Sequence, residues 1–317
     1  MPEIELRPFR PDDAVAVHAL HLRHVAADHI DPHSTVAPLP DVDELRRRCE
    51  VANWAAVALD GSGGPVGWAM LISWTEDDGT TVRRADGYVA PPARRRGIGT
   101  RLLVATEAAA RELAGEGVLA ANASSVQPDR VALLQRHGYR RVFSLVEMVH
   151  DGQDRPLHPL PGGVAVRTAT VGDAAALIGL TARAWAGRPF FIRPDEDGLR
   201  DWLARTDLSL FQVASTDNQL VGLVAAVPRA GFAEIVDVQT DPAFQRRGLA
   251  SALVGRVVVE LARRGAGPVR LHTEGDDPAG ARSLYERLGF RTVREHGRYR
   301  KPASTPARPV TDPASEV

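Results

Sequence analysis

The chain has 317 residues, of which 44% are hydrophobic and 25% charged, a composition typical of globular proteins and a length that suits two domains. A formal net charge of −1 gives no reason to expect a nucleic-acid or membrane partner. Cys49 is the only cysteine, which excludes an intrachain disulfide and favours a cytoplasmic location. Charged residues among the first thirteen positions (MPEIELRPFRPDD) argue against a secretory signal. The chain has no uncharged apolar run of about 18 residues, so no transmembrane helix is predicted.

The same order of elements is predicted twice along the chain. Asp12 and Asp173 each precede apolar residues at helical spacing and mark the start of a helix. The predicted strands are residues 3–7, 54–59 and 66–74 in the first half and 164–167, 210–214 and 220–227 in the second. In each half a further strand ends at a proline, Pro91 or Pro242, and an arginine- and glycine-rich loop then leads into a long helix.

The long helix of the second half carries a single apolar stripe, so it should pack on a sheet. The stripe consists of Leu249, Leu253, Val257 and Leu261. The second half is then completed by a strand at 269–273, a short helix that contains Tyr285 and a terminal hairpin at 289–299.

Two short motifs recur at one fixed offset. Residues 94–99 (RRRGIG) are repeated as 245–250 (QRRGLA), and residues 134–139 (LQRHGY) are repeated as 285–290 (YERLGF). Their glycines are 151 positions apart in both cases. A repeat this long indicates duplicated domains rather than a solenoid.

The repeat predicts two tandem α/β domains. The first is expected at residues 1–149 and the second at residues 164–301. Residues 150–163 (HDGQDRPLHPLPGG) are rich in proline and glycine and have no periodicity, which predicts a linker. Residues 302–317 have no hydrophobic pattern and are predicted to be a disordered tail.

The loop at 245–250 has features that suit a bound anion. It lies between a strand and the start of a helix, where unpaired backbone N–H groups and the helix dipole favour a phosphate. Gly248 has no Cβ and would let the backbone approach the phosphate closely, and Ala250 keeps the next turn small. Arg246 and Arg247 can add charge-assisted hydrogen bonds. The occurrence of this loop twice in matching contexts favours a diphosphate site over an ordinary helix start.

These motifs resemble those of the GNAT superfamily of acetyl-CoA-dependent N-acetyltransferases, most closely at residues 233–250 and 277–290. The resemblance implies a mixed sheet flanked by helices and opened into a V, which receives the pantetheine arm of acetyl-CoA. The backbone of Val238 and Thr240 would pair with the pantetheine. The loops implied to bind the diphosphate comprise Gln245, Arg246, Arg247, Gly248, Leu249, Ala250 and Ser251 and, in the first domain, Arg94, Arg95, Arg96, Gly97, Ile98 and Gly99.

The resemblance also implies catalytic residues in the second domain. Tyr285 holds the position at which many members carry a tyrosine that protonates the leaving CoA thiolate. Glu234, fourteen residues before the loop glycine, is the expected base or ammonium anchor. Strand alternation puts Glu234 on the same face as Val238 unless a bulge shifts the register, so Asp237 remains an alternative.

The first domain lacks both catalytic features. Leu134 occupies the tyrosine position, and Arg83 stands fourteen residues before Gly97. Its arginine- and glycine-rich loop is intact. The second domain is therefore expected to be catalytic, and the first to be catalytically degenerate, with or without bound CoA.

The function implied is transfer of an acetyl group from acetyl-CoA to the primary amine of a small molecule. The acceptor could be a metabolite, an amino sugar or antibiotic, or a molecule like a mycothiol precursor. The alternative is a non-catalytic acyl-CoA-binding sensor or scaffold. No metal site is predicted, because neither cysteines nor an HExxH spacing accompany the histidines at 18–33. The chain is expected to be a monomer or homodimer.

Overall fold

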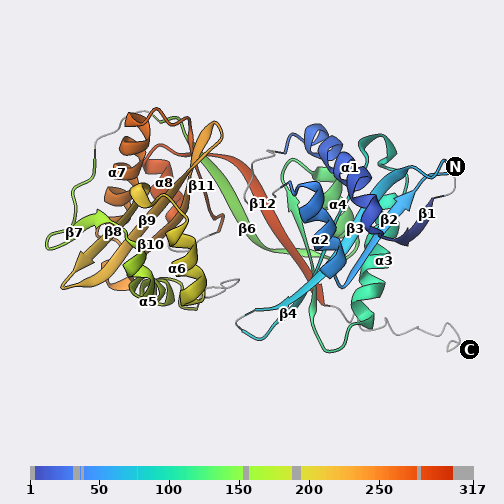
Figure 1. Ribbon diagram of the computed structural model, residues 1–317, viewed down its shortest axis with the longest axis horizontal. Helices are drawn as coiled ribbons and strands as arrows, with labels where there is room; N and C mark the ends of the chain where they lie inside the picture. Colours follow the sequence, from blue (N-terminus) through green and yellow to red (C-terminus); the bar gives the residue numbers. More distant parts are fainter. Residues whose placement is uncertain are drawn as a thin grey trace, which may run out of the picture. The chain divides into compact units, whose positions relative to one another are not determined.

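The computed structural model describes residues 4–30, 36, 39–76, 78–152, 157–187, 194–276 and 280–302 (Figure 1). Of the predicted tail at 302–317, only Pro302 lies within these ranges. None of the described helices is both long enough and apolar enough to cross a membrane.

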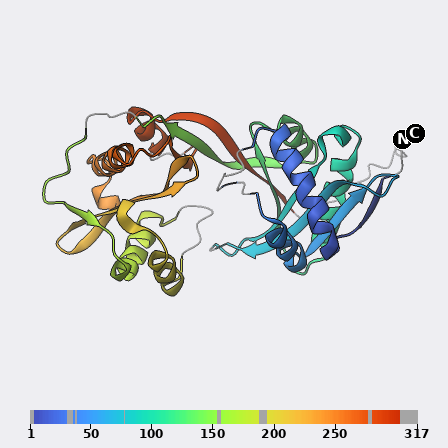
Figure 2. The same ribbon diagram turned by 45° about the horizontal axis from the view of Figure 1, so that its top comes forward.

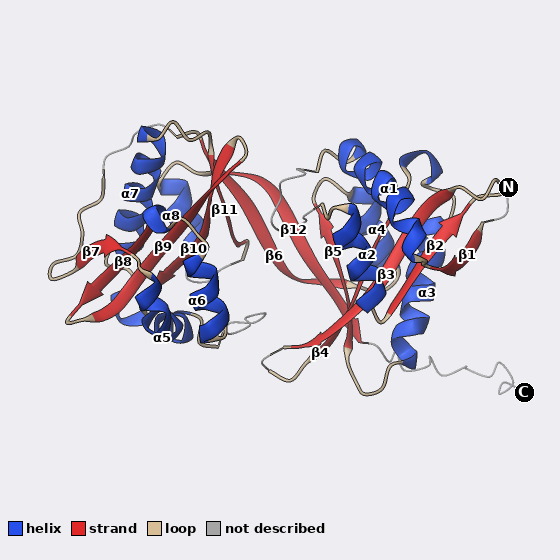
Figure 3. Cartoon of the chain, viewed as in Figure 1, coloured by secondary structure: helices blue, strands red, loops and turns tan. Residues whose placement is uncertain are grey.

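Helices and strands follow one another in the same order in both halves of the chain (Figure 3). The first half contains β1 (Glu5–Pro8), α1 (Ala14–Ala27), α2 (Val42–Val51), β2 (Trp54–Leu59), β3 (Pro65–Thr75), β4 (Thr81–Val89), α3 (Ile98–Glu112), β5 (Val118–Ser124), α4 (Pro128–Arg136) and β6 (Arg140–His150). The second half contains β7 (Ala165–Thr168), α5 (Ala174–Ala184), α6 (Glu196–Ala204), β8 (Phe211–Thr216), β9 (Gln219–Arg229), β10 (Phe232–Thr240), α7 (Leu249–Arg263), β11 (Val269–Glu274), α8 (Ala281–Arg287) and β12 (Arg291–Pro302).

The chain forms two compact units. Unit 1 comprises residues 1–142 and 298–317, and unit 2 comprises residues 143–297. These divisions fall within β6 and β12 rather than in the segment 150–163, which was predicted as the linker from the sequence repeat. The reason is strand pairing, because β6 completes the sheet of unit 2 by pairing antiparallel with β11.

The end of β12 completes unit 1 instead. Arg300 forms an ion pair with Glu76, and Lys301 Nζ lies 2.6 Å from the carboxylate of Glu107. The predicted terminal hairpin at 289–299 is wrong, because this segment is part of one long strand. A hairpin prediction assumes that neighbouring segments pair, whereas the strand order places β12 after β5.

Unit 1 is a mixed sheet with helices on both faces. Its strand order is β1-β2-β3-β4-β5 followed by β12, with β4 and β5 parallel. Side chains alternate between the faces of β3, so Trp68 packs with Val17 of α1 and Leu45 of α2, whereas Ala69 packs with Ile98 of α3. Figure 2 shows α1, in blue, lying over the strands of this sheet.

Unit 2 repeats this architecture in the order β6-β11-β10-β9-β8-β7. Helices α5 and α6 cover the face of β9 that carries Leu223 and Ala225. Helices α7 and α8 cover the other face, where the predicted stripe of α7 is buried with exposed fractions of 1% or less. The predicted α/β class with two tandem mixed-sheet folds is confirmed.

Candidate active site

Strand β10 of unit 2 contains a bulge. The register with β9 shifts just before Asp237 and leaves Val236 as an extra, exposed residue. Before the bulge Glu234 pairs with Val227, and after it Asp237 pairs with Ala225. Because paired residues lie on one face of a sheet, the bulge puts both carboxylates on the face covered by α5.

Val238 lies on the opposite face. It pairs with Val224 and packs against the core beneath α7. Simple alternation, which would put Glu234 and Val238 on the same face, is therefore wrong here because the bulge inserts one residue between them.

The bulge lies where β10 and β11 separate. Their parallel pairing runs from Ala233 to Ile235, whereas β10 continues to Thr240. The residues from Asp237 to Thr240 pair with β9 on one side, and the described pairing with β11 on the other side does not reach them. This is the V-shaped opening that the resemblance implied between the two parallel strands.

Glu234 is buried and in contact with two cationic or hydrogen-bonding side chains. Its side chain is 5% exposed. Arg229 approaches Oε2 with Nε and Nη2, each at 3.2 Å. Nδ1 of His272, on β11, lies 3.6 Å from Oε1. The position of Glu234 is thus determined by β10, β9 and β11 together.

Asp237 lies beside a hydrogen-bond chain from α5. Thr181 Oγ1 donates to Gln239 Oε1 at 3.0 Å, and Gln239 Nε2 donates to Asp237 Oδ2 at 2.7 Å. Burial raises the pKa of Asp237 to about 6, although the bonds from Gln239 and from the backbone N–H of Val238 act in the opposite direction. The residue as a whole is partly exposed to solvent. A partly accessible carboxylate with a raised pKa is a candidate for proton transfer.

The two arginine- and glycine-rich loops share one backbone form. Arg246 and Gly248 have φ values of 61° and 85°, and Arg95 and Gly97 have 62° and 80°. Each glycine is the N-cap of a long helix, α7 or α3. Such turns direct backbone N–H groups toward one point and create an anion-binding concavity at the positive end of the helix dipole.

The predicted residues of the second loop occupy different environments. Gln245, Arg246, Arg247 and Gly248 are exposed, whereas the side chain of Leu249 is buried under α7. Leu249 can therefore contact a phosphate only through its backbone. Ala250 and Ser251 are partly buried in the first turn of the helix.

Tyr285 lies on α8 and is 6% exposed. Its ring packs edge-on against Phe290 with centroids 5.8 Å apart, and it belongs to the same buried cluster as Leu249. Val238 packs against that cluster. The structure thus brings the predicted acid, the loop and the end of β10 into one region of unit 2.

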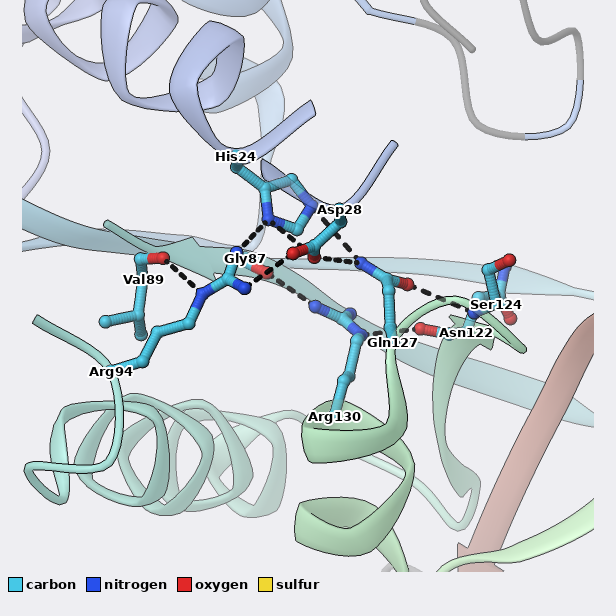
Figure 4. Close-up of polar contacts among 9 residues, drawn as sticks. All are labelled: His24, Asp28, Gly87, Val89, Arg94, Asn122, Ser124, Gln127 and Arg130. Carbon is cyan, nitrogen blue, oxygen red and sulfur yellow. Dashed lines mark hydrogen bonds and ion pairs between the residues drawn. The ribbon is translucent and has the colours of Figure 1, made fainter. Parts of the chain in front are cut away.

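The corresponding loop of unit 1 borders a cavity of about 430 Å³, whose lining includes Arg94, Gly97 and Leu134. Arg94 points toward α1, where it contacts Asp28 at 2.5 Å and His24 Nδ1 at 2.9 Å (Figure 4). The predicted residues Arg94–Gly99 therefore divide, since the first arginine is held by α1 while Arg95 and Arg96 are exposed.

Arg130 bridges the two separating strands of unit 1. Pairing of β4 with β5 ends at Ala85 and Ala121. Just beyond that point, Arg130 Nη1 donates to the carbonyl of Gly87 at 2.5 Å, and Nε donates to the carbonyl of Asn122 at 2.6 Å (Figure 4). The matching position of unit 2, 151 residues later, is Ala281. An alanine cannot bridge the opening in this way.

A cluster of polar side chains in unit 2 contacts Glu234 through His272. Glu147 on β6, His272 on β11 and His296 on β12 present atoms within 4.8 Å of one another. Arg270 and Arg294 lie 3.7 Å and 3.5 Å from the Glu147 carboxylate. The spacing of these three side chains resembles that of a metal site. Two guanidinium groups this close to the carboxylate repel a metal cation, so the local charge disfavours metal binding.

The paired motifs, the split strands and the two glycine-capped helices match one family. The family model described as the acetyltransferase (GNAT) family matches residues 22–139 and 179–290. The chain belongs to the GNAT family of acetyltransferases. The predicted enzyme class, an acyltransferase, is confirmed.

Curated relatives of this GNAT protein match both halves. The mycothiol acetyltransferase of Beutenbergia cavernae is 34% identical over 259 residues, which cover 77% of this chain and 82% of the relative. That of Geodermatophilus obscurus is 33% identical over 303 residues, which cover 88% and 91%.

Solved structures share the tandem fold. A GCN5-related N-acetyltransferase from Sphaerobacter thermophilus has a TM-score of 0.73 at 24% identity, with 95% of this chain and 96% of that chain covered. A tandem GNAT protein from the clavulanic acid biosynthesis pathway has a TM-score of 0.68 at 18% identity, with 96% and 99% covered. The predicted tandem GNAT organisation is confirmed.

Some residues of this GNAT site could not be found from the motifs. Arg229, His272 and Glu147 reach the neighbourhood of Glu234 from other strands, so their relevance follows only from strand pairing. Thr181 was overlooked because a threonine in a helix carries no local signal. Asp277, the first residue of the motif at 277–290, lies outside the described residues.

Proposed function

We propose that this GNAT protein transfers an acetyl group from acetyl-CoA to a small primary amine and that unit 2 carries the active site. The proposed acceptor is a cysteinyl pseudodisaccharide, the kind of molecule that serves as a mycothiol precursor. Its support is the name of the curated relatives, which match 82% and 91% of their own lengths to this chain. The single, buried cysteine supports action in the cytoplasm. The chain is proposed to act there as a monomer or homodimer.

The observation that carries this proposal is the bulge in β10. It turns two carboxylates toward α5 while Val238 packs toward α7. The acceptor amine would approach from the α5 face, and the acyl donor would enter the opening between β10 and β11. One strand would then present an acidic group to the amine and a backbone N–H to the acetyl oxygen.

The donor would be held by backbone and arginine contacts. The N–H groups at the start of α7, with Arg246 and Arg247, would bind the diphosphate of acetyl-CoA. The backbone of Val238 and Thr240 would pair with the pantetheine, as a neighbouring strand would. Gln245 to Ser251 form the loop and first helical turn that position these groups.

The reaction needs a base for the ammonium and an acid for the leaving thiolate. A carboxylate on the α5 face would take the ammonium proton. The backbone N–H near Val238 would stabilise the oxyanion, and Tyr285 would give a proton to the departing sulfur. This assignment is supported by the packing of Tyr285 on Phe290 and by the buried cluster that Tyr285 shares with Leu249, the first residue of α7.

Unit 1 would be degenerate in chemistry. It has Leu134 in place of the tyrosine, and Arg130 bridges the carbonyls of β4 and β5 where the pantetheine would enter. Its loop, Arg94 to Gly99, still borders a cavity that can receive part of a CoA molecule.

The test is release of CoA thiol when the purified chain is mixed with acetyl-CoA and the cysteinyl pseudodisaccharide. We expect turnover that depends on the acceptor and is lost when its amine is blocked. Acetyl-CoA binding measured by calorimetry, without thiol release on this or other amines, would instead support the alternative of an acyl-CoA sensor or scaffold.

A further inference from the structure

Two carboxylates of β10 lie on the face covered by α5, and the proposed function does not decide which one takes the proton. Glu234 precedes the bulge and Asp237 follows it. Their partners on β9, Val227 and Ala225, are two positions apart. The two carboxylates are therefore neighbours along one face, with their Cα atoms about 7 Å apart by strand geometry.

Glu234 is occupied by a guanidinium group. Arg229 contacts Oε2 with two nitrogens at 3.2 Å, and His272 Nδ1 lies 3.6 Å from the other oxygen. A carboxylate paired with arginine is a poor proton acceptor, because the adjacent positive charge favours its ionised form. Such a carboxylate can still attract and orient an ammonium group.

Asp237 has a different environment. Its side-chain hydrogen bond comes from Gln239, a neutral amide, at 2.7 Å. Thr181 donates to the oxygen of that amide, so the Gln239 NH₂ group is directed at Asp237 and cannot turn away without losing a bond. The hydrogen bonds from Thr181 to Gln239 and from Gln239 to Asp237 fix the position of the carboxylate and add no positive charge. Burial raises the pKa of Asp237 to about 6, which leaves it ionised at neutral pH and able to accept a proton.

Unit 1 offers a natural contrast at the same positions. Its strand β4 has Asp86 opposite Met70, on the face covered by α1, but Arg84 contacts that carboxylate at 2.9 Å. In unit 1 the arginine contact is made to Asp86, by Arg84. In unit 2 it is made to Glu234, by Arg229. Asp237 instead accepts its side-chain hydrogen bond from a neutral donor, the amide of Gln239.

We propose that Asp237 is the general base of unit 2 and that Glu234 anchors the acceptor ammonium, an assignment that rests on the proposed function. The ammonium R–NH₃⁺ gives one proton to Asp237, which becomes a neutral carboxylic acid. The freed nitrogen lone pair forms the N–C bond to the acetyl carbon, and the C–S bond breaks with its electron pair on sulfur. Tyr285 protonates the sulfur and regains a proton from the nitrogen through solvent. Asp237 then releases its proton to water.

The test compares two isosteric variants, Asp237→Asn and Glu234→Gln, with the cysteinyl pseudodisaccharide as acceptor. Thiol release is measured between pH 5 and 9 to obtain kcat and the acceptor KM separately. We expect Asp237→Asn to lower kcat by about 10²-fold or more with the acceptor KM changed less than about 3-fold. The acid limb near pH 6 should disappear in this variant, because the group that must be ionised is gone.

Glu234→Gln should act on binding. We expect the acceptor KM to rise by about 10-fold, with kcat reduced far less and the acid limb kept. Asp237→Glu should restore part of kcat and keep an acid limb. Unchanged acetyl-CoA binding and thermal unfolding in each variant exclude a loss of fold.

Three results would count against the assignment. An acid limb and kcat that survive Asp237→Asn but vanish in Glu234→Gln would make Glu234 the base. A fall in kcat in Asp237→Asn with the acid limb unchanged would reduce Asp237 to a structural contact of Gln239. Absence of thiol release by the unmodified chain would overturn the proposed function together with this inference, whereas the first two results leave that function standing.

Discussion

The two units share one fold but differ on one face of the sheet, the face covered by α1 in unit 1 and by α5 in unit 2. In unit 1, His21 of α1 stacks on Tyr88 of β4 with ring centroids 4.2 Å apart. The matching contact in unit 2 is the hydrogen bond from Thr181 to Gln239. An aromatic stack thus stands where the other unit has a polar chain leading to a carboxylate. The two units thus keep one scaffold but have diverged on this surface.

The bulge explains why counting residues misaligns the two strands. β4 pairs with β3 without a register shift along its described length, and Arg84 pairs with Ile72. In the bulged strand the residue at the equivalent pairing position is Glu234, opposite Val227. The structural counterpart of Glu234 is therefore Arg84, not Arg83. Arg83 instead points to the end of α3 and donates to backbone carbonyls there.

The largest expected effect tests whether one loop alone supports turnover. Gly248→Glu puts a negative charge at the start of α7, and we expect thiol release to fall by at least about 10³-fold because the diphosphate is repelled. Gly97→Glu is the matched control, since both glycines have φ near +80° and an added Cβ meets no atom within 4 Å at either. It should keep turnover within about 3-fold.

Calorimetric titration with acetyl-CoA completes this comparison. Loss of all binding heat in Gly248→Glu would place the only donor site in unit 2. Equal loss of turnover in both variants would contradict the assignment of chemistry to unit 2.

Tyr285→Phe should have the next largest effect. We expect kcat to fall about 10–100-fold with little change in acetyl-CoA binding, because the ring still packs while the proton donor is gone. The effect should shrink with acyl donors whose thiol leaves more easily. Leu134→Phe at the matching position of unit 1 is the control and should leave kcat near that of the unmodified chain; a comparable fall there would contradict the division of roles.

Local motifs were sufficient for the fold and the donor loop. Both loop glycines have the left-handed conformation that their motif implied, and the stripe of α7 is buried as its spacing predicted. Helix α2 is not indicated by the sequence pattern, because it is short, consists mostly of charged residues and buries only Leu45 and Cys49. These successes and this failure follow from how much of each element's stability is local.

The acceptor side could not be predicted in the same way. The sequence allows the bulge only as an alternative, because Val236 is apolar like Ile235 and Val238 and nothing marks it as the inserted residue. The placement of Glu147 beside His272 depends on pairing between strands more than 100 residues apart in sequence. Long-range pairing of this kind is specified by the whole sheet rather than by any segment.

Acid should affect the two units in opposite directions. Burial lowers the pKa of His21 to about 4 and, with help from Arg130 and Arg94, that of His24 to about 3. The unfolded chain binds these protons below pH 6.5 while folded unit 1 does not, so unit 1 loses stability as the pH falls. We expect a loss of about 1–2 kcal/mol per histidine at pH 5.

Unit 2 contains the reverse case in Asp237. Its raised pKa means that the folded state binds a proton before the unfolded state does, so this group adds stability as the pH falls from about 6 toward 3.8. Hydrogen exchange of peptides at pH 7 and pH 5, corrected for intrinsic rates, should show larger loss of protection in unit 1. Equal losses in both units would contradict it, and His24→Gln should reduce the difference.

The smallest effect is expected where the units are alike. Asp13 accepts from both Nη atoms of Arg7 at 2.7 Å, and Asp173 accepts from both Nη atoms of Arg167 at 2.8 and 2.6 Å. Each also accepts from a backbone N–H at the start of its helix, that of Arg10 or Thr170. Replacing either aspartate by asparagine should lower the free energy of unfolding by about 1 kcal/mol. The effect is small because solvent reaches the arginine of each pair and screens the interaction.

The pH dependence distinguishes this contact from mere packing. The bonds from Arg167 and Thr170 lower the pKa of Asp173 to about 2 from 3.8, so its contribution is complete above 3.8 and is lost as the pH falls toward 2. The difference between Asp173→Asn and the unmodified chain, measured by denaturant unfolding, should therefore shrink over that window. Equal values for Asp13→Asn and Asp173→Asn would mark the helix start as shared scaffold, whereas a much larger value in one unit would mean that the helix starts have diverged as well.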